Sequence, residues 1–234
     1  MNTFRTALRW TVLVAAWVGF VPMVAGQSPG AEPVLRQWLA RQTNLTTWTA
    51  DFVQTRNLKA LTQPLTTPGK VWFRAPAQFR WELGQPAQSV ALRGEADLLI
   101  LAPKLKRAER YPVAAFATGP MGDALALLDT GFPRDATAFT NRFAILGLAE
   151  TNATHAFRLQ PRAKAAQKVL TELTVFVATN DFQLRATELV FRDGSRLRND
   201  FTNAVENAPI EAGQFEPALD ATWKVTEPLR GRQP

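Results

Sequence analysis

The side chains that most often perform catalysis are scarce in this sequence. It contains no cysteine and one histidine, His155, which follows a polar stretch typical of a solvated hairpin tip. Protein zinc sites are built largely from these two residue types, so we expect no metal site. None of Ser28, Ser89 and Ser195 stands in the Gly-x-Ser-x-Gly pattern of serine hydrolases, and the sequence has no glycine-rich phosphate loop.

Paired carboxylates are another route to catalysis, because two of them carry out glycoside hydrolysis. Glu82, Glu172 and Glu188 are the candidates. Each alternates with apolar residues, which is the ordinary pattern on the solvated side of a β-sheet. We therefore expect no catalytic residue, no enzyme activity and no cofactor, and a function in binding.

The N-terminus has the pattern of a secretory signal peptide. Two arginines precede an apolar run from Trp10 to Val24, and the small residue Gly26 marks the expected cleavage site. A membrane anchor is the alternative, but spanning a bilayer takes about 20 apolar residues, and this run is shorter and contains Pro22. We expect a signal peptide over residues 1–26 and a periplasmic mature protein.

Composition limits the partners of the mature chain. Lys and Arg number 27 against 20 Asp and Glu, a formal net charge of +7. A basic surface can meet acidic lipid headgroups or an acidic protein, whereas export and the lack of basic runs with interleaved aromatics disfavour nucleic acid. We expect one domain over residues 27–225, present as a monomer, and a flexible basic tail over residues 226–234.

Short β-strands dominate the predicted secondary structure. Residues 32–42 place apolar side chains at helical spacing, and residues 48–58 then change to the alternation of a strand. Residues 78–83 alternate most clearly, with Phe79, Trp81 and Leu83 on one face. Short helices are expected over 123–129 and 135–140, and further strands over 69–74, 89–92, 97–102, 106–111, 142–148, 156–160, 169–178, 183–192, 196–203 and 215–225.

These elements predict a mainly β (α+β) fold with an N-terminal helix. Ten or eleven locally connected strands form one long antiparallel sheet, which has to curve or split. We expect a single open half-barrel with short lid helices. A closed transmembrane barrel requires an unbroken apolar exterior, and Arg80, Glu82, Arg196, Arg198 and Asp200 occupy its outward positions.

Aromatic residues occur on many of the predicted strands, and their alternation does not decide what they contact. They either fill an ordinary core or line a cavity for an apolar ligand, since alternation gives the face of a residue and not what occupies the space beside it. The residues in question are Trp72, Phe73, Phe79, Trp81, Phe176 and Phe191.

Several motifs, taken in order along the chain, resemble the LolA family of outer-membrane lipoprotein carriers. Each is weak alone, but together they span nearly the whole mature chain. They are Phe52-Val53-Gln54, residues 69–81 (GKVWFRAPAQFRW), the 90–107 hairpin with its turn at Gly94, Phe157 to Pro161, the 184–201 hairpin with its Asp193-Gly194 turn, and Phe215-Glu216-Pro217.

The resemblance implies a carrier that accepts an acylated lipoprotein from an inner-membrane ABC transporter and passes it to an outer-membrane receptor or membrane. The alternative is a carrier or sensor of another lipid or glycolipid on the same fold. Met121, Leu125 and Leu128 would form the apolar side of the lid. The cavity would be lined by these three and by Trp72, Phe79, Trp81, Leu83, Leu92, Leu99, Leu101, Phe176 and Phe191.

One position departs from the family pattern. Members often carry an arginine directly before the proline of the 69–81 motif, where it locks the lid, and here Ala75 stands in that place. The neighbouring Arg74 should point to the opposite face. Either a local bulge allows Arg74 to control the lid, or the protein closes without this lock.

Overall fold

The computed structural model describes residues 30–116, 132–133, 135–151 and 153–229. Their strands form one 12-stranded sheet in the order β12-β6-β5-β4-β3-β2-β1-β11-β10-β9-β8-β7. The mainly β, open half-barrel expected from the sequence is confirmed. The strands are β1 (Thr47–Asn57), β2 (Leu65–Arg74), β3 (Gln78–Leu83), β4 (Ser89–Arg93), β5 (Asp97–Ala102), β6 (Arg107–Pro112), β7 (Phe143–Glu150), β8 (Thr154–Pro161), β9 (Leu170–Ala178), β10 (Leu184–Phe191), β11 (Arg196–Glu206) and β12 (Lys224–Thr226).

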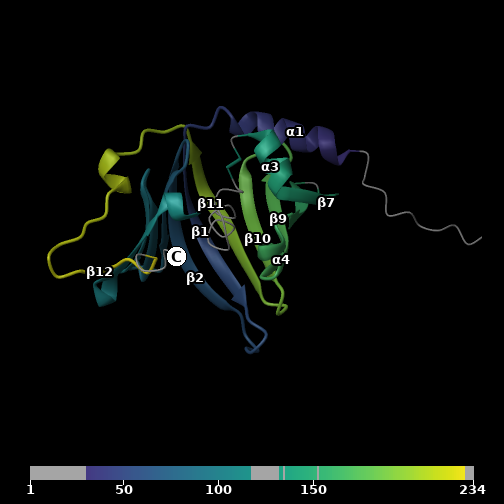
Figure 1. The fold of residues 1–234 in the computed structure, drawn as a ribbon. Helices are drawn as coiled ribbons and strands as arrows, with labels where there is room; N and C mark the ends of the chain where they lie inside the picture. Colours follow the sequence, from purple (N-terminus) through teal and green to yellow (C-terminus); the bar gives the residue numbers. More distant parts are fainter. Residues whose placement is uncertain (1–29, 117–131, 134, 152, 230–234) are drawn as a thin grey trace, which may run out of the picture.

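The sheet has two halves that join where β1 pairs with β11. Strands β1 to β6 are connected as successive antiparallel neighbours, as are β7 to β11, and the β1–β11 ladder closes the order with Phe52 opposite Phe201. The short β12 differs from the expected all-antiparallel sheet, because it pairs in parallel with β6. The sheet curves, with helices across one end (Figure 1).

Two helices cover this end of the sheet. Helix α1 (Ala31–Gln42) buries Leu35, Trp38 and Leu39, as its apolar stripe predicts. The Trp38 ring stacks on Phe157 of β8 at 5.4 Å and meets Phe139 of helix α3 (Ala136–Arg142) edge-on at 5.6 Å. Helix packing thus anchors α1 on the β7–β9 side (Figure 1).

Helix α3 (Ala136–Arg142) confirms the helix expected over 135–140. The Asp135 side chain accepts hydrogen bonds from the backbone N–H groups of Thr137 and Ala138, which is the usual N-cap arrangement. The helix expected over 123–129 and the signal peptide lie outside the described residues. The other short helices of the described residues are α4 (Lys164–Gln167) and the 3-10 turns η1 (Pro103–Leu105), η2 (Val113–Phe116) and η3 (Ala212–Phe215).

The inner, concave face of the sheet carries the main core. Leu98 of β5 and Leu159 of β8 lie far apart in the strand order, yet they belong to one buried cluster with Trp38 of α1. Only the inside of a curved sheet brings such distant strands together. We call this face the inner face and its opposite the outer face.

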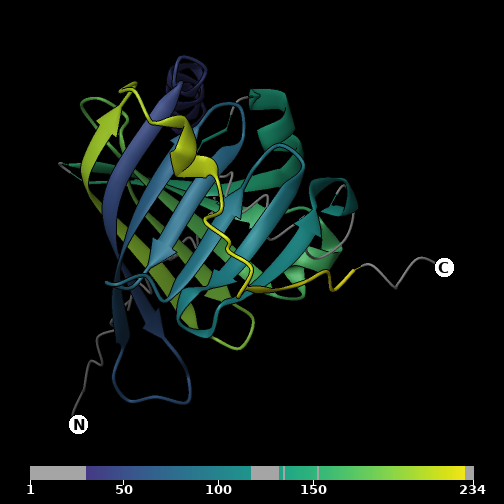
Figure 2. The same cartoon turned by 90° about the vertical axis from the view of Figure 1, so that its left-hand side faces the viewer.

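The outer face of β2–β6 is also apolar and carries a second cluster. Val90, Leu92, Leu99, Leu101 and Ala108 are buried there against Phe215. Figure 2 shows the C-terminal segment crossing this face over the blue and teal strands. These strands are therefore buried on both sides, which explains why residues 98–101 are apolar at every position.

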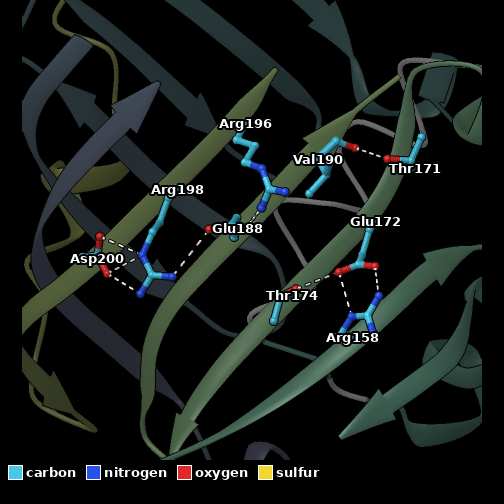
Figure 3. A network of polar contacts seen from close by, with 9 residues as sticks. All are labelled: Arg158, Thr171, Glu172, Thr174, Glu188, Val190, Arg196, Arg198 and Asp200. Atoms are coloured by element: carbon cyan, nitrogen blue, oxygen red, sulfur yellow. Dashed lines mark hydrogen bonds and ion pairs between the residues drawn. The ribbon is translucent and has the colours of Figure 1, made fainter. Parts of the chain in front are cut away.

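The outer face of β8–β11 is polar instead (Figure 3). Arg158 and Glu172 form two hydrogen bonds of 3.0 and 2.6 Å. Arg198 lies between Glu188, at 3.6 Å, and Asp200, at 2.8 Å. Glu172 and Glu188 are therefore parts of surface ion pairs rather than a carboxylate pair.

The C-terminal end differs from its prediction. In place of one strand over 215–225, the chain forms η3 and an extended segment before β12. The flexible tail was expected to begin at residue 226, but Thr226 is the last residue of β12 and pairs with Glu109 of β6. Leu229 packs against the inner core, and residues 230–234 lie outside the described part of the chain.

The Glu172–Arg158 pair predicts a pH dependence of stability. The bond from Arg158 lowers the pKa of Glu172 below its ordinary value of 4.5. A lowered carboxyl pKa stabilises the fold above that value, and the contribution disappears as the pH falls through the folded-state pKa. We expect Glu172→Gln to reduce the urea midpoint at about pH 7 and to reduce it by clearly less at about pH 3. An equal loss at both values would contradict the assignment, and Glu95→Gln in an exposed turn is the control.

Gly69 in β2 is predicted to tolerate no side chain. A Cβ there would overlap the Phe52 ring and the backbone carbonyl oxygen of Glu82, whereas a Cβ at Gly147 in β7 would meet nothing within 4 Å. We expect Gly69→Ala to lower the free energy of unfolding by about 1 to 3 kcal/mol, as overpacking does. Chemical denaturation measures this, with Gly147→Ala as the matched control; equal effects at the two sites would refute the prediction.

Candidate functional site

The inner face carries a group of neighbouring aromatic rings, with Phe73 opposite Trp48 in the β1–β2 pairing. We call it the inner aromatic cluster: Trp48, Phe52, Phe73, Trp81 and Phe201. Phe52 and Trp81 are the closest pair, with ring centroids 4.5 Å apart. Phe201 lies 6.0 Å from Trp81 and 5.2 Å from Trp48. The rings come from β1, β2, β3 and β11 and form one continuous apolar surface at the join of the two half-sheets.

Phe132 covers part of this cluster from outside the sheet. Its ring stacks on Phe73 at 4.4 Å with an interplanar angle of 11°, and lies 4.9 Å from Trp48. It is 9% exposed. Phe132 belongs to the connection before α3 and to no strand. This part of the sheet's apolar surface is therefore shielded by a residue from outside the sheet.

A row of polar side chains crosses the inner face next to the aromatic rings. The Gln54 Nε2 donates to Asn199 Oδ1 at 3.1 Å, and the Asn199 Nδ2 donates to Thr187 Oγ1 at 3.2 Å. Gln54 and Asn199 are 8% and 6% exposed. Buried amides need such partners, because an unsatisfied one costs about 1 to 3 kcal/mol. The row marks where the aromatic surface ends along β1, β11 and β10.

Four of the predicted cavity residues lie on the inner face. Phe79 is buried in the main core, and Trp81, Leu83 and Phe191 pack against it. Trp81 belongs to the inner aromatic cluster, while Phe191 stands at the far end of β10. Whether these residues contact a ligand stays a prediction. Met121, Leu125 and Leu128 lie outside the described residues.

Five other predicted cavity residues are on the outer face, so their assignment to the inner cavity is wrong. Strand pairing places Trp72 opposite Arg80, Arg80 opposite Leu92, and Leu92 opposite Leu99. All members of such a row share a face. Trp72, Leu92, Leu99 and Leu101 therefore pack in the second cluster.

Phe176 is the fifth misplaced residue. The Arg198 guanidinium lies over its ring at 4.5 Å, within the polar outer face of β8–β11. Its neighbours Val175 and Val177 point into the main core. The reason is again the two-residue period of a strand, since Phe176 alternates with the inward valines.

Arg74 also occupies the outer face, and β2 has no bulge that would turn it inward. Its Nη2 donates to the carbonyl oxygen of Ile210 at 2.6 Å, and its guanidinium lies 4.5 Å from the Phe215 ring. Ala75 packs against the inner core. Arg74 thus fastens the C-terminal segment, and the expectation that it controls a lid is not supported by its contacts.

Three of the most central rings, those of Trp48, Phe52 and Phe201, were not among the residues expected to line the cavity. Trp48 and Phe52 lie on the same face of β1, and Phe201 lies opposite Phe52. These rings can be located from the sequence by counting the strand register across the turns. Residues 75–77 place Arg74 opposite Gln78, which puts Phe73 beside Phe79 and moves Trp72 to the other face.

His155 differs from its expected place in solvent. It is 7% exposed in β8, its ring stacks on Phe182 at 5.7 Å, and its Nδ1 lies 3.5 Å from Glu150 Oε2. Among the described residues, no group of three or more His, Cys, Asp or Glu could hold a metal ion. Within the same part of the chain, no helix is long and apolar enough to cross a bilayer.

Comparison with known proteins points to one family. Residues 43–218 match the family model described as outer membrane lipoprotein carrier protein LolA. No curated protein sequence matches the chain significantly. The matched range contains every strand except β12.

Several solved structures are similar to this chain at low sequence identity. An uncharacterized conserved protein from Thermus thermophilus is 10% identical, with a TM-score of 0.51 over 84% of this chain and 98% of that one. A putative outer membrane lipoprotein-sorting protein domain from Vibrio parahaemolyticus is 13% identical, with a TM-score of 0.45 over 79% and 95%. A LolA superfamily protein from Nitrosomonas europaea is 9% identical, with a TM-score of 0.42 over 80% and 97%. At 10% identity, the Thermus likeness concerns the fold alone.

The contacts of Arg74 predict that it holds the C-terminal segment on the outer face. Arg74→Ala removes a charge-assisted bond to a carbonyl, worth about 1.5 to 3 kcal/mol. We expect amide hydrogen exchange over residues 208–219 to accelerate by about tenfold or more. Arg107→Ala, an exposed arginine of β6, is the control. Unchanged exchange in Arg74→Ala would contradict the role.

Proposed function

We propose that this chain, which belongs to the family of outer membrane lipoprotein carrier protein LolA, carries acylated lipoproteins across the periplasm. The observation that supports this most strongly is the inner aromatic cluster covered by Phe132. A filled core holds its rings between helices and strands, whereas among the described residues this surface is partly covered by Phe132, which belongs to a connecting segment. The acyl chains would take the place of that ring.

The energies involved allow such an exchange. Burying a phenylalanine side chain is worth about 1.5 to 3 kcal/mol, and each buried methylene is worth about 0.8 kcal/mol. About four methylenes thus offset the loss of the Phe132 contacts. A longer acyl chain gains further free energy from each methylene that reaches the inner face. The empty protein remains closed, while a long chain can open it.

The same argument determines how the cargo leaves. Acyl chains that are sheltered from water do not return to water at a useful rate, so release requires direct transfer to another apolar site. We infer that an inner-membrane ABC transporter supplies the lipoprotein and that an outer-membrane receptor or the membrane itself accepts it. The carrier itself then needs no nucleotide, metal or chemical step, which agrees with a family of carriers rather than enzymes.

A second candidate function is the carriage of a free lipid or glycolipid. It is favoured by Ala75 and Arg74, because the arginine that often precedes the family's proline is absent and its neighbour faces outward. A differently controlled lid would suit a different cargo. The molecules that copurify with the protein separate the two functions.

The proposal predicts opposite effects for two inner-face variants. Trp81→Glu places a charge between Phe52 and Phe201 and is expected to abolish copurification of acylated proteins from periplasm. Phe132→Ala removes the competing ring and is expected to tighten acyl-chain binding by about tenfold or more. Capture followed by mass spectrometry, and titration with a fluorescent acyl peptide, measure these effects.

Val53→Glu is the matched control, because Val53 is 46% exposed next to Phe52 on β1. Circular dichroism checks that each variant is folded. If Phe132→Ala lowers stability without strengthening binding, the ring is an ordinary core residue and the proposal fails. Recovery of free lipid without acylated protein would favour the second candidate.

A further inference from the structure

A pocket lies at the end of the sheet opposite α1. It has a volume of about 630 Å³, within the usual range of small-ligand sites. The last residues of β1, the β10–β11 turn and the start of β9 form its walls, and strand pairing brings these segments together. Figure 1 shows the β1–β2 and β10–β11 hairpins at this end.

The floor of the pocket is apolar. It is lined by Leu58, Val169, Phe191 and Leu197. Leu58 and Val169 are 38% and 56% exposed, so this apolar surface is open to solvent rather than part of a packed core. The positions follow from alternation, because Leu197 continues the inner row of Asn199 and Phe201 along β11. The pocket therefore lies beyond the polar row of Gln54, Asn199 and Thr187.

The rim of the pocket is cationic. Arg56, Lys168, Arg192 and Arg196 all line it, against one carboxylate, that of Asp193. This carboxylate accepts two hydrogen bonds from Ser195, at 2.8 and 3.0 Å, and so is already occupied within its own turn. Arg196 also has a partner, since it bonds Glu188 on the outer face at 3.0 Å.

The other three cations lack such partners. Within the described part of the chain, no ion pair involves Arg56, Lys168 or Arg192. The Nε of Arg56 is buried and makes no hydrogen bond there. A buried donor without a partner is uncommon, because it costs free energy. An acid group in the pocket would satisfy this donor.

We propose that this pocket binds one anionic amphiphile, with its carboxylate or phosphate at Arg56, Lys168 and Arg192 and its chain on the apolar floor. The site is separate from the inner aromatic cluster, and its ligand differs from the uncharged acylated end of a lipoprotein. A planar guanidinium suits either acid group, since it offers two parallel N–H donors. The shared chemistry is therefore one acid group next to one alkyl chain.

The test compares three ligands of equal chain length, namely dodecanoate, dodecyl phosphate and dodecanol, by titration calorimetry on the purified chain below micelle formation. We expect at least one acid to bind about tenfold more tightly than the alcohol, which is about 1.4 kcal/mol. The more tightly bound of the two acids identifies the preferred head group. Arg56→Gln is expected to remove this preference and to leave dodecanol binding unchanged.

Further variants separate the site from folding defects and from the carrier site. The double variant Lys168→Gln/Arg192→Gln alters only exposed residues and should also reduce the preference for the acids over dodecanol. Arg107→Gln on β6 should retain this preference. Trp81→Glu should weaken the binding of all three ligands to the carrier site and leave the preference of the pocket for the acids unchanged. Equal affinity for the acids and the alcohol, or a preference that survives both pocket variants, would overturn the proposal.

Discussion

A curved sheet has to shield its concave apolar face from water, and the rest of this structure depends on how that is done. Helices α1 and α3 cover one end through Trp38 and Phe139, which are fixed by packing on both sides. Next to the join of the half-sheets, Phe132 performs the same task from a connecting segment. The first cover is built into the fold, whereas the second contributes little enough free energy to be exchanged for a ligand.

The outer face is shielded in two different ways, which divides the sheet functionally. Over β2–β6 it is apolar and lies under the C-terminal segment, held by Phe215 and by Arg74. Over β8–β11 it is solvated and carries ion pairs such as that of Arg158 with Glu172. Because neither arrangement involves the inner face, the outer face can stabilise the sheet while the inner face remains available for binding.

Strand β1 shows how one alternating row can serve successive purposes. Its inward residues begin with Trp48 and Phe52 in the aromatic cluster and continue to Gln54 in the polar row. Arg56 and Leu58 then reach the cation-rimmed pocket. The chemistry along this line changes from aromatic to amide to guanidinium within one strand. The proposed carrier site and the proposed acid-binding site can therefore be neighbours without sharing a side chain.

Alternation and helical spacing in the sequence were enough to predict a mainly β half-barrel, an N-terminal helix and the common face of Phe79, Trp81 and Leu83. These features depend on local periodicity, which the order of residues determines directly. The sequence did not indicate which of the two faces is concave. Residues 98–101 are apolar at each position, so Leu99 and Leu101 were assigned inward although they face the C-terminal segment.

Tertiary structure decided which face is concave. A strand that is buried on both sides has no alternating polar residues to identify its outer face. Tertiary structure also decided the roles of Phe132 and Arg56. Phe132 belongs to no periodic element, and its role comes from a contact with Phe73, which lies far from it in the sequence. Arg56 lines the same pocket as Lys168 and Arg192 because three segments of the chain converge there, and that convergence exists only once the register of the whole sheet is established.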